Sequence, residues 1–321
     1  MMKNDMQRIL VSPLLALTLV SIAFFAGGCA TTQGQQTSER QLTFRTPEQA
    51  VQAIADLAGT GDFQKAEAVF GPGSAELLQS GDEVADRNSA LMAKQKIQEK
   101  VAFEDLDAKT RIPVLGNDGW QFPFPLVRVR GGWRFDTQRG REEIINRRIG
   151  RDELSTIATL HAIVDAQKEY FDGRHEGRSR AYAARVISTP GKHDGLYWPT
   201  REGEKLSPLG PLVAEAVAEG YRKKPENPEP IPYHGYYYRP LAAQGRNAPG
   251  GARSYVDAKG VQSKGFAVIA WPAKYGNSGV MSFIVDRQGI VFQKDLGPET
   301  SAAAGAIQAY DPDDSWTPTA D

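Results

Sequence analysis

The sequence has only one cysteine in 321 residues, so no disulfide can form within the chain. It also has no excess of basic side chains, because 38 Lys and Arg stand against 39 Asp and Glu and the net charge is −1. Nucleic-acid-binding proteins normally carry a basic excess or a basic stripe, so this balance argues against a nucleic-acid partner. After residue 29 no apolar run approaches the ~20 residues that a membrane-crossing helix needs. We therefore expect a body that folds in water.

Catalytic signatures are missing as well. The chain has no His-Glu-x-x-His, no Gly-x-Ser-x-Gly, no phosphate-binding Gly-Lys-Ser/Thr loop and no cysteine pair for zinc. Its four histidines all lie in the second half, at His161, His175, His193 and His234. His161 and Asp165 are four residues apart, a spacing that suits a metal pair, but no third ligand accompanies them. The sequence thus predicts no catalytic residue, no metal and no cofactor, and favours a protein that is not an enzyme.

The first 29 residues have the pattern of an export signal. Lys3 and Arg8 precede an uncharged, mostly apolar run over 9–26, and small residues follow up to Cys29. This ending resembles a bacterial lipobox, which implies cleavage before Cys29 and attachment of lipid, palmitate included, to its thiol. Residue Ala30 is not Asp, which by resemblance to Gram-negative sorting rules implies the periplasmic face of the outer membrane. A plain anchor helix and a structural buried cysteine are the alternatives.

The chain divides into six predicted segments. Apolar residues at helical spacing follow Thr46-Pro47-Glu48, and hairpin turns over 116–119 and 130–132 separate strand-like runs. The segments are a signal peptide (1–28), a lipidated flexible tether (29–43), an α+β domain (44–137), a charged connector (138–153), a long helix packed on an antiparallel sheet (154–310) and an acidic, loose tail (311–321). The predicted fold class is therefore α+β, with two small domains that each combine helices and an antiparallel sheet.

The predicted connector is dense in charge. Its arginines, at Arg139, Arg141, Arg147, Arg148 and Arg151, alternate with acidic residues. Glu143 and Arg147 are four residues apart and can pair on a helix surface. Two interpretations are open: a solvated, internally paired connector, and a patch that binds an anionic ligand or a phospholipid headgroup.

Aromatic side chains crowd the segment 233–238, where Tyr236 and Tyr238 share one face of an expected strand. If they are exposed, these rings and Trp198 form a candidate surface for binding a protein or the sugar rings of peptidoglycan. If they are buried, they are sheet core with paired hydroxyls.

Several segments together resemble a bacterial family of exported proteins, domain of unknown function 2950. They are 44–51 (FRTPEQAV), 118–127 (DGWQFPFPLV), 133–137 (WRFDT), 147–150 (RRIG), 166–170 (AQKEY), 195–199 (GLYWP), 207–211 (SPLGP) and 235–239 (GYYYR). The resemblance implies export, often with a signal or lipid anchor, and no established activity. At the level of fold, the first half is similar to NTF2-like domains and the second half to the soluble head of type IV pilins and pseudopilins, which does not fix a function.

Two hypotheses of function follow. In the first, the protein is a non-enzymatic cell-envelope lipoprotein that is held on a membrane by its lipid and binds an envelope protein or a glycan such as peptidoglycan. In the second, it is an envelope enzyme or small-ligand binder that uses a cavity in the first domain. Converging carboxylates and hydroxyls in such a cavity would favour an enzyme. A filled apolar core and an exposed aromatic patch would favour the first hypothesis.

Overall fold

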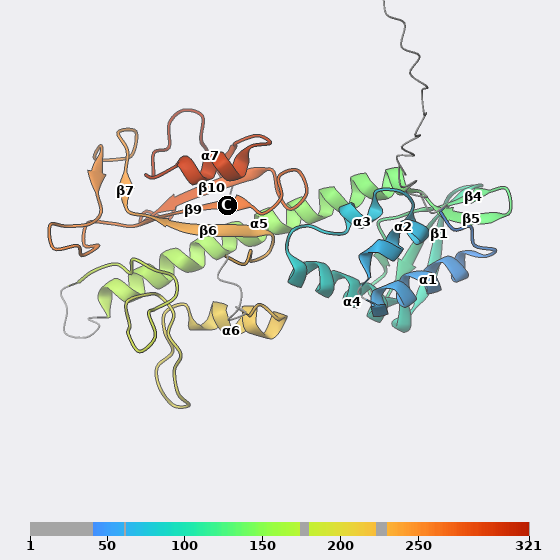
Figure 1. Cartoon of the computed structure of the whole chain (residues 1–321), viewed down its shortest axis with the longest axis horizontal. Helices are drawn as coiled ribbons and strands as arrows, with labels where there is room; N and C mark the ends of the chain where they lie inside the picture. Colours follow the sequence, from blue (N-terminus) through green and yellow to red (C-terminus); the bar gives the residue numbers. More distant parts are fainter. Residues whose placement is uncertain (1–40, 61, 174–179, 223–229, 321) are drawn as a thin grey trace, which may run out of the picture. The chain divides into compact units, whose positions relative to one another are not determined.

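The computed structural model describes residues 41–60, 62–173, 180–222 and 230–320. All of these residues fall within one structural unit, Ser38–Asp321. The predicted signal peptide, Cys29 and residues 29–40 of the predicted tether lie outside the described residues. The described elements are helices and antiparallel sheets (Figure 1), so the predicted α+β class is confirmed.

The first half of the unit packs helices against a five-stranded antiparallel sheet. The helices are α1 (Pro47–Thr60), α2 (Ala66–Phe70), α3 (Ser74–Leu77) and α4 (Glu83–Glu99), with a 3-10 turn over Phe63–Lys65. The strands are β1 (Val101–Asp107), β2 (Thr110–Leu115), β3 (Trp120–Gln121), β4 (Leu126–Val129) and β5 (Gly132–Phe135). Their order is β1-β2-β4-β5, with β3 paired to β2. Helix α4 begins after Asp82, whose carboxylate accepts the N–H groups of Val84 and Ala85.

Four phenylalanine rings form the centre of the first core. The ring of Phe70 in α2 lies 4.6 Å from that of Phe124 and 5.0 Å from that of Phe135, measured between centroids. The Phe122 ring lies 6.0 Å from that of Phe70. Val51 of α1, 1% exposed, belongs to the same core. Aromatic packing of this kind contributes beyond the burial of area alone, so it fixes the 122–124 segment against the helices.

Helix α5 (Thr137–Asp172) is 36 residues long and belongs to both halves. In Figure 1 it is the long green helix that runs from the elements of the first half to the sheet of the second. Ile144 packs on the first core, whereas Leu160 and Val164 belong to a second core. The predicted connector, 138–153, is therefore the first part of this helix.

A glycine permits the close approach of α5 to the first core. Gly140 is buried against the ring of Phe124, and a Cβ at this position would overlap atoms of that ring. The absence of a side chain thus sets how near the start of α5 lies to the aromatic centre of the first half.

The second half contains a five-stranded antiparallel sheet whose faces are both covered. Its strands are β6 (Tyr236–Leu241), β9 (Ala267–Pro272), β10 (Met281–Asp286), β11 (Phe292–Asp295) and β12 (Thr317–Pro318), in the order β12-β11-β10-β9-β6. Strands β7 (Ala243–Gln244) and β8 (Arg253–Ser254) pair separately, and α6 (Gly210–Glu219) and α7 (Thr300–Ala306) complete the half. Val268 and Phe283 face the second core beside α5, whereas Ile269 and Ile284 face a third core beside α7.

The end of the chain is packed rather than loose. Trp316 is 8% exposed and belongs to the third core. Strand β12 pairs with β11, with Pro318 opposite Phe292. The expectation of a loose tail is therefore wrong for residues 311–320, because burial of one large aromatic side chain outweighs the acidic, proline-containing composition around it.

Candidate functional site

A cavity of about 1020 Å³ lies in the first half, between α1, α4 and α5. Its lining comes from α1, from Phe70 of α2, from residues 78–93 around the start of α4, from residues 120–124 and from α5. Most of the lining surface is apolar. Small-molecule sites typically enclose ~300–1000 Å³ and have mostly apolar walls with a few polar groups, so this cavity has the size and composition of a ligand site.

One face of α5 forms a wall of the cavity. The lining residues Ile144, Arg147, Arg148 and Arg151 are spaced three, four and seven residues from the first, which places them on one side of a helix. Arg147 and Arg151 are exposed and Arg148 is buried. The predicted pairing of Glu143 with Arg147 is confirmed, since Oε1 of Glu143 lies 2.6 Å from Nε of Arg147.

Helix α4 forms the opposite wall, and the side chains that it contributes change from charged to small along its length. Charged Glu83, Asp86 and Arg87 line the cavity near the start of the helix. Small Ala90 and Ala93 line it one to two turns further on. The small side chains leave the space that the cavity occupies, whereas the charged ones surround its polar end.

The apolar end of the cavity is the surface of the first core. Phe122 and Phe124 line it and are 7% and 1% exposed. Ile54 and Leu57 of α1 complete this end. The same aromatic rings that hold the first half together therefore provide the apolar floor on which a ligand could lie.

Buried charge surrounds the polar end. The Arg148 guanidinium donates through Nη1 to the carbonyl of Leu77, at 3.0 Å, and to Oδ1 of Asn277. Burial lowers the pKa of Arg148, while the nearby carboxylates of Asp86 and Asp152 raise it. Burial also raises the pKa of Asp86, whose carboxylate accepts the N–H of Ser80 at 2.9 Å. Arg148 is thus held in place by several acceptors and forms a fixed positive wall.

Arg148 and Asp86 extend into a network of polar groups that joins the two halves. We call it the junction network; its members are Asp82, Asp86, Arg148, Asp152, Tyr221, Gly235 and Asn277. Asp82 accepts the hydroxyl of Tyr221 at 2.8 Å and the N–H of Gly235 at 2.9 Å. Burial of Asp152 raises its pKa to about 6, although Arg151 donates to its Oδ1 and acts in the opposite direction.

The backbone at Gly235 is shaped around Asp152. Its φ of +76° is accessible chiefly to glycine, and a Cβ there would lie 2.7 Å from Oδ2 of Asp152. The junction network therefore depends on a close backbone approach as well as on its side chains. It positions Arg148, and through Asp152 also Arg151, at the polar end of the cavity.

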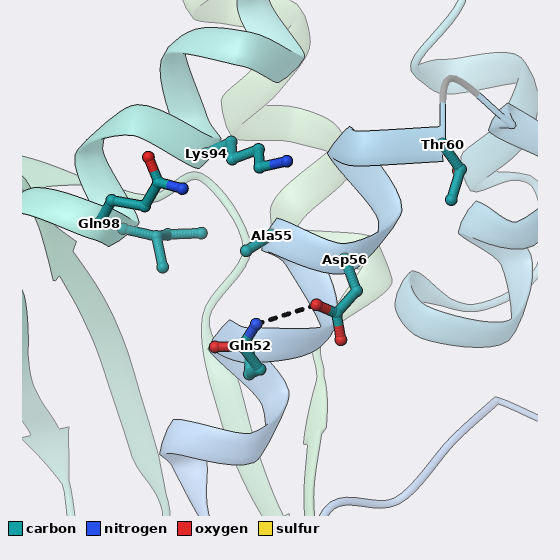
Figure 2. Close-up of a pocket in the computed structure, with 7 residues that line it drawn as sticks. Gln52, Ala55, Asp56, Thr60, Lys94 and Gln98 are labelled. Carbon is teal, nitrogen blue, oxygen red and sulfur yellow. Dashed lines mark hydrogen bonds between the residues drawn. The ribbon is translucent and has the colours of Figure 1, made fainter.

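A second, shallower groove of about 590 Å³ lies between α1 and α4. Figure 2 shows Gln52 and Asp56 on α1, with Lys94 and Gln98 on the neighbouring helix. The amide of Gln52 donates to Oδ1 of Asp56 at 2.9 Å. Most side chains of this groove are polar and the acidic and basic groups balance, so the larger cavity is the better candidate for a ligand site.

The structure places the predicted aromatic residues apart from this cavity. Tyr236 is fully buried in the second core, and its hydroxyl donates to the carbonyl of Met281 at 2.9 Å. Tyr238 is partly buried against the same core, and burial raises the pKa of its hydroxyl to about 12. The core interpretation that the sequence left open describes both positions. Trp198 is partly exposed and stacks on His193, with ring centroids 4.4 Å apart.

The cavity residues were not predicted as a site, although two signals point to them. Segments 118–127 and 147–150, which carry part of the family resemblance, both contribute to the lining. The helical spacing from Ile144 to Arg151 would have placed three arginines on one face. The Glu143–Arg147 pair fits the internally paired interpretation of the charged stretch, and the anionic-ligand interpretation stays a prediction.

Among the described residues there is neither a metal-binding group nor a helix that could cross a membrane. Within residues 41–60, 62–173, 180–222 and 230–320, no three His, Cys, Asp or Glu side chains are grouped so that they could hold a metal ion. Over the same part of the chain, no helix has both the length and the hydropathy for a bilayer crossing.

Together these features define an α+β protein with a ligand-sized, largely apolar cavity that arginines border. The chain matches the family described as "Protein of unknown function (DUF2950)" over residues 41–319, and it belongs to that family. Comparison with curated proteins gave no significant match. Comparison with solved structures gave none either, so the similarities to NTF2-like domains and pilin heads stay predictions.

Proposed function

We propose that this protein is an exported, lipid-anchored binding protein of the bacterial cell envelope that holds a small ligand in the cavity of its first half. The signal pattern over 1–28 and the lipobox-like position of Cys29 support export and a lipid anchor on the periplasmic face of the outer membrane. More than one fatty chain is needed for stable anchoring, and bacterial lipoproteins carry several.

The cavity between α1, α4 and α5 carries the proposal of ligand binding. Its volume of about 1020 Å³ lies at the upper end of the ~300–1000 Å³ that small-molecule sites enclose. Its mainly apolar walls, with charged groups on α4 and α5, are the composition of a small-molecule site.

Binding without catalysis fits the chemistry of the lining. Among the lining side chains there is no histidine or cysteine, and Asp86 already accepts a backbone N–H. General acid–base or nucleophilic chemistry needs a reactive group with an adjacent base that a third group orients. The lining instead offers apolar rings and guanidinium groups, which recognise a ligand.

The anchor is tested at Cys29. Mass spectrometry of the mature protein purified from membranes should find residue 29 at the N-terminus, with fatty chains attached. The Cys29→Ser variant should lose both the fatty chains and the membrane association. A mature protein with a free thiol at residue 29, or with the leader retained, would remove this part of the proposal.

The cavity is tested by filling it. N-phenyl-1-naphthylamine, a neutral dye that fluoresces in apolar surroundings, should bind the unit 38–321, which contains all three cores. Ala90→Trp places a large ring in the cavity and should weaken dye binding at least tenfold. Gln95→Trp, on the same helix outside the lining, is the matched control and should bind the dye like wild type. Equal binding by all three proteins would show that the dye does not occupy the cavity.

Binding of an envelope protein or of peptidoglycan is the second candidate. The partly exposed ring of Trp198, stacked on His193, is the observation that favours it. Recovery of partners from envelope extracts should fall with Trp198→Ala if this surface binds them. Identical recovery with wild type and variant would contradict it.

A further inference from the structure

We propose that the cavity ligand is an amphipathic anion, with one apolar chain and a carboxylate or phosphate head, and that Arg147 and Arg151 receive the head. This inference rests on the proposed ligand-binding function and assigns the chemical class of the ligand. It follows from the distribution of apolar and charged groups around the cavity.

The cavity wall combines two kinds of group. One part consists of rings and aliphatic side chains from the first core, with Phe122 and Phe124 almost fully buried. The other is the face of α5 that presents Arg147, Arg148 and Arg151, and Arg147 borders the apolar part, since its Nη1 donates to the carbonyl of the residue before Phe122. A ligand that contacts both kinds of wall carries an apolar part and a negative group within one molecule.

Arg147 and Arg151 retain donors for a ligand. Arg147 uses Nε for Glu143 and Nη1 for the carbonyl of Gln121, both at 2.6 Å, and its Nη2 is not used in these bonds. Arg151 binds Oδ1 of Asp152 through Nε and Nη2, which leaves Nη1. About half of the Arg151 side chain is exposed. Both guanidinium groups can therefore donate to an additional oxyanion, whereas the buried Arg148 already donates to Leu77 and Asn277.

Arg147 and Arg151 are not surrounded by an excess of positive charge. Four arginines and three acidic residues line the cavity. In addition, Arg147 pairs with Glu143 and Arg151 pairs with Asp152. Selection of an anionic head therefore comes from the N–H donors that Arg147 and Arg151 keep after this pairing.

The mouth of the cavity explains why the ligand should also carry a chain. Leu91 and Met92 of α4 line the cavity and are 45% and 40% exposed. Exposed apolar side chains grouped beside a cavity mark a surface that a ligand or partner covers. An alkyl chain that enters between α4 and the phenylalanine floor would remove these side chains from water.

A matched series of ligands tests the inference. Dodecanoate, dodecyl phosphate and 1-dodecanol have the same chain and differ in the head. The anions are titrated below their micelle concentrations and the alcohol below its solubility limit, against unit 38–321 loaded with N-phenyl-1-naphthylamine. We expect both anions to displace the dye at concentrations about tenfold lower than the alcohol does, which is the usual size of a charge-assisted contact. The double variant Arg147→Gln/Arg151→Gln should reduce this ratio to about one, with the dye affinity of each protein measured first and used to convert displacement into ligand affinity.

The control variant is Arg130→Gln/Arg134→Gln, which removes the same charge from exposed residues outside the lining. It should keep the wild-type preference for anions. Thermal unfolding of each variant checks that the fold is intact. A dye that binds but is displaced equally well by alcohol and anions overturns the ligand class while the proposed function stands. No dye binding at all defeats the proposed function itself.

Two further outcomes would also overturn the inference. If the anion preference survives in Arg147→Gln/Arg151→Gln, these arginines do not receive the head. If the protein binds vesicles of anionic phospholipid but no monomeric amphiphile, the arginines contact a membrane surface and not a single ligand. Preference for dodecyl phosphate over dodecanoate, or the reverse, distinguishes a phospholipid-like from a fatty-acid-like source.

Discussion

The two halves of this protein use aromatic and aliphatic side chains in different ways. In the second half, strands β9 and β10 are covered on both faces, and Phe283 and Ile284 are at most 1% exposed. In the first half, Phe122 lies at the edge of a cavity, and Leu91 is exposed at its mouth. The second half buries its apolar side chains and gains stability from them, whereas the first half leaves part of its own apolar surface available to a ligand.

The largest effect should come from the second core. Phe283→Ala removes a fully buried ring and should lower the free energy of unfolding by about 3–5 kcal/mol. Phe122→Ala, beside an existing cavity, should cost less, because part of the ring already lacks neighbours. Urea unfolding of both variants measures the difference. A larger loss for Phe122→Ala would reverse the assignment of roles to the two halves.

The stability that the junction network gives to the fold should decrease as the pH rises. Because burial raises the pKa of Asp152 to about 6, the folded protein binds a proton there at pH 4–6 when the unfolded chain does not. The stability that protonated Asp152 contributes is therefore fully present below pH 3.8 and decreases as the pH rises through 6. Asp152→Asn should raise the free energy of unfolding by up to about 3 kcal/mol at pH 8 and by little at pH 4.

The measurement is urea unfolding of wild type and Asp152→Asn at both pH values. Asp165→Asn, a change of the same chemistry at an exposed position of α5, serves as the control and should show no such dependence. Destabilisation by Asp152→Asn at pH 8 would mean that the Arg151 and Arg148 partners outweigh the cost of burial.

A smaller loss is expected when one hydroxyl of the junction network is removed. Tyr221→Phe removes the donor to the buried carboxylate of Asp82 and should lower the free energy of unfolding by about 1–2 kcal/mol. Tyr237→Phe, in which the altered residue is only partly buried, should change stability by less than about 0.5 kcal/mol. Equal effects of the two variants would show that the Tyr221 hydroxyl does not join the halves energetically.

The smallest effect on stability should accompany a clear effect on binding. Leu91→Gln/Met92→Gln changes exposed side chains and should alter the free energy of unfolding by less than about 0.5 kcal/mol. The same variant should weaken binding of N-phenyl-1-naphthylamine severalfold, because both residues line the cavity mouth. If stability falls sharply and binding is unchanged, these residues belong to the core and not to a site.

Much of the fold could be predicted from the sequence, for reasons visible in particular strands. The antiparallel sheet predicted within 154–310 contains β9 (Ala267–Pro272) and β10 (Met281–Asp286), whose largely apolar sequences are typical of strands buried on both faces. Strand β1 (Val101–Asp107) was not predicted. It is an edge strand with an exposed acidic segment, so it has no apolar alternation to reveal it.

The site was harder to predict because it is assembled from distant segments. The sequence of 138–153 is so rich in charge that it predicts a connector. The helical spacing of Ile144 and the arginines around it does not stand out among these charges. The cavity also depends on small residues such as Ala90, whose effect appears only when α4 lies opposite α5. No local sequence pattern encodes a space between helices.

The length of α5 limits how the molecule can move. A helix of 36 residues extends about 54 Å at 1.5 Å per residue, and each turn is tied to the next by backbone hydrogen bonds. Rotation of one half against the other within α5 would require several of these hydrogen bonds to break. Because α5 is continuous from Arg148 to Leu160, it contains no loop that could serve as a hinge between the two halves.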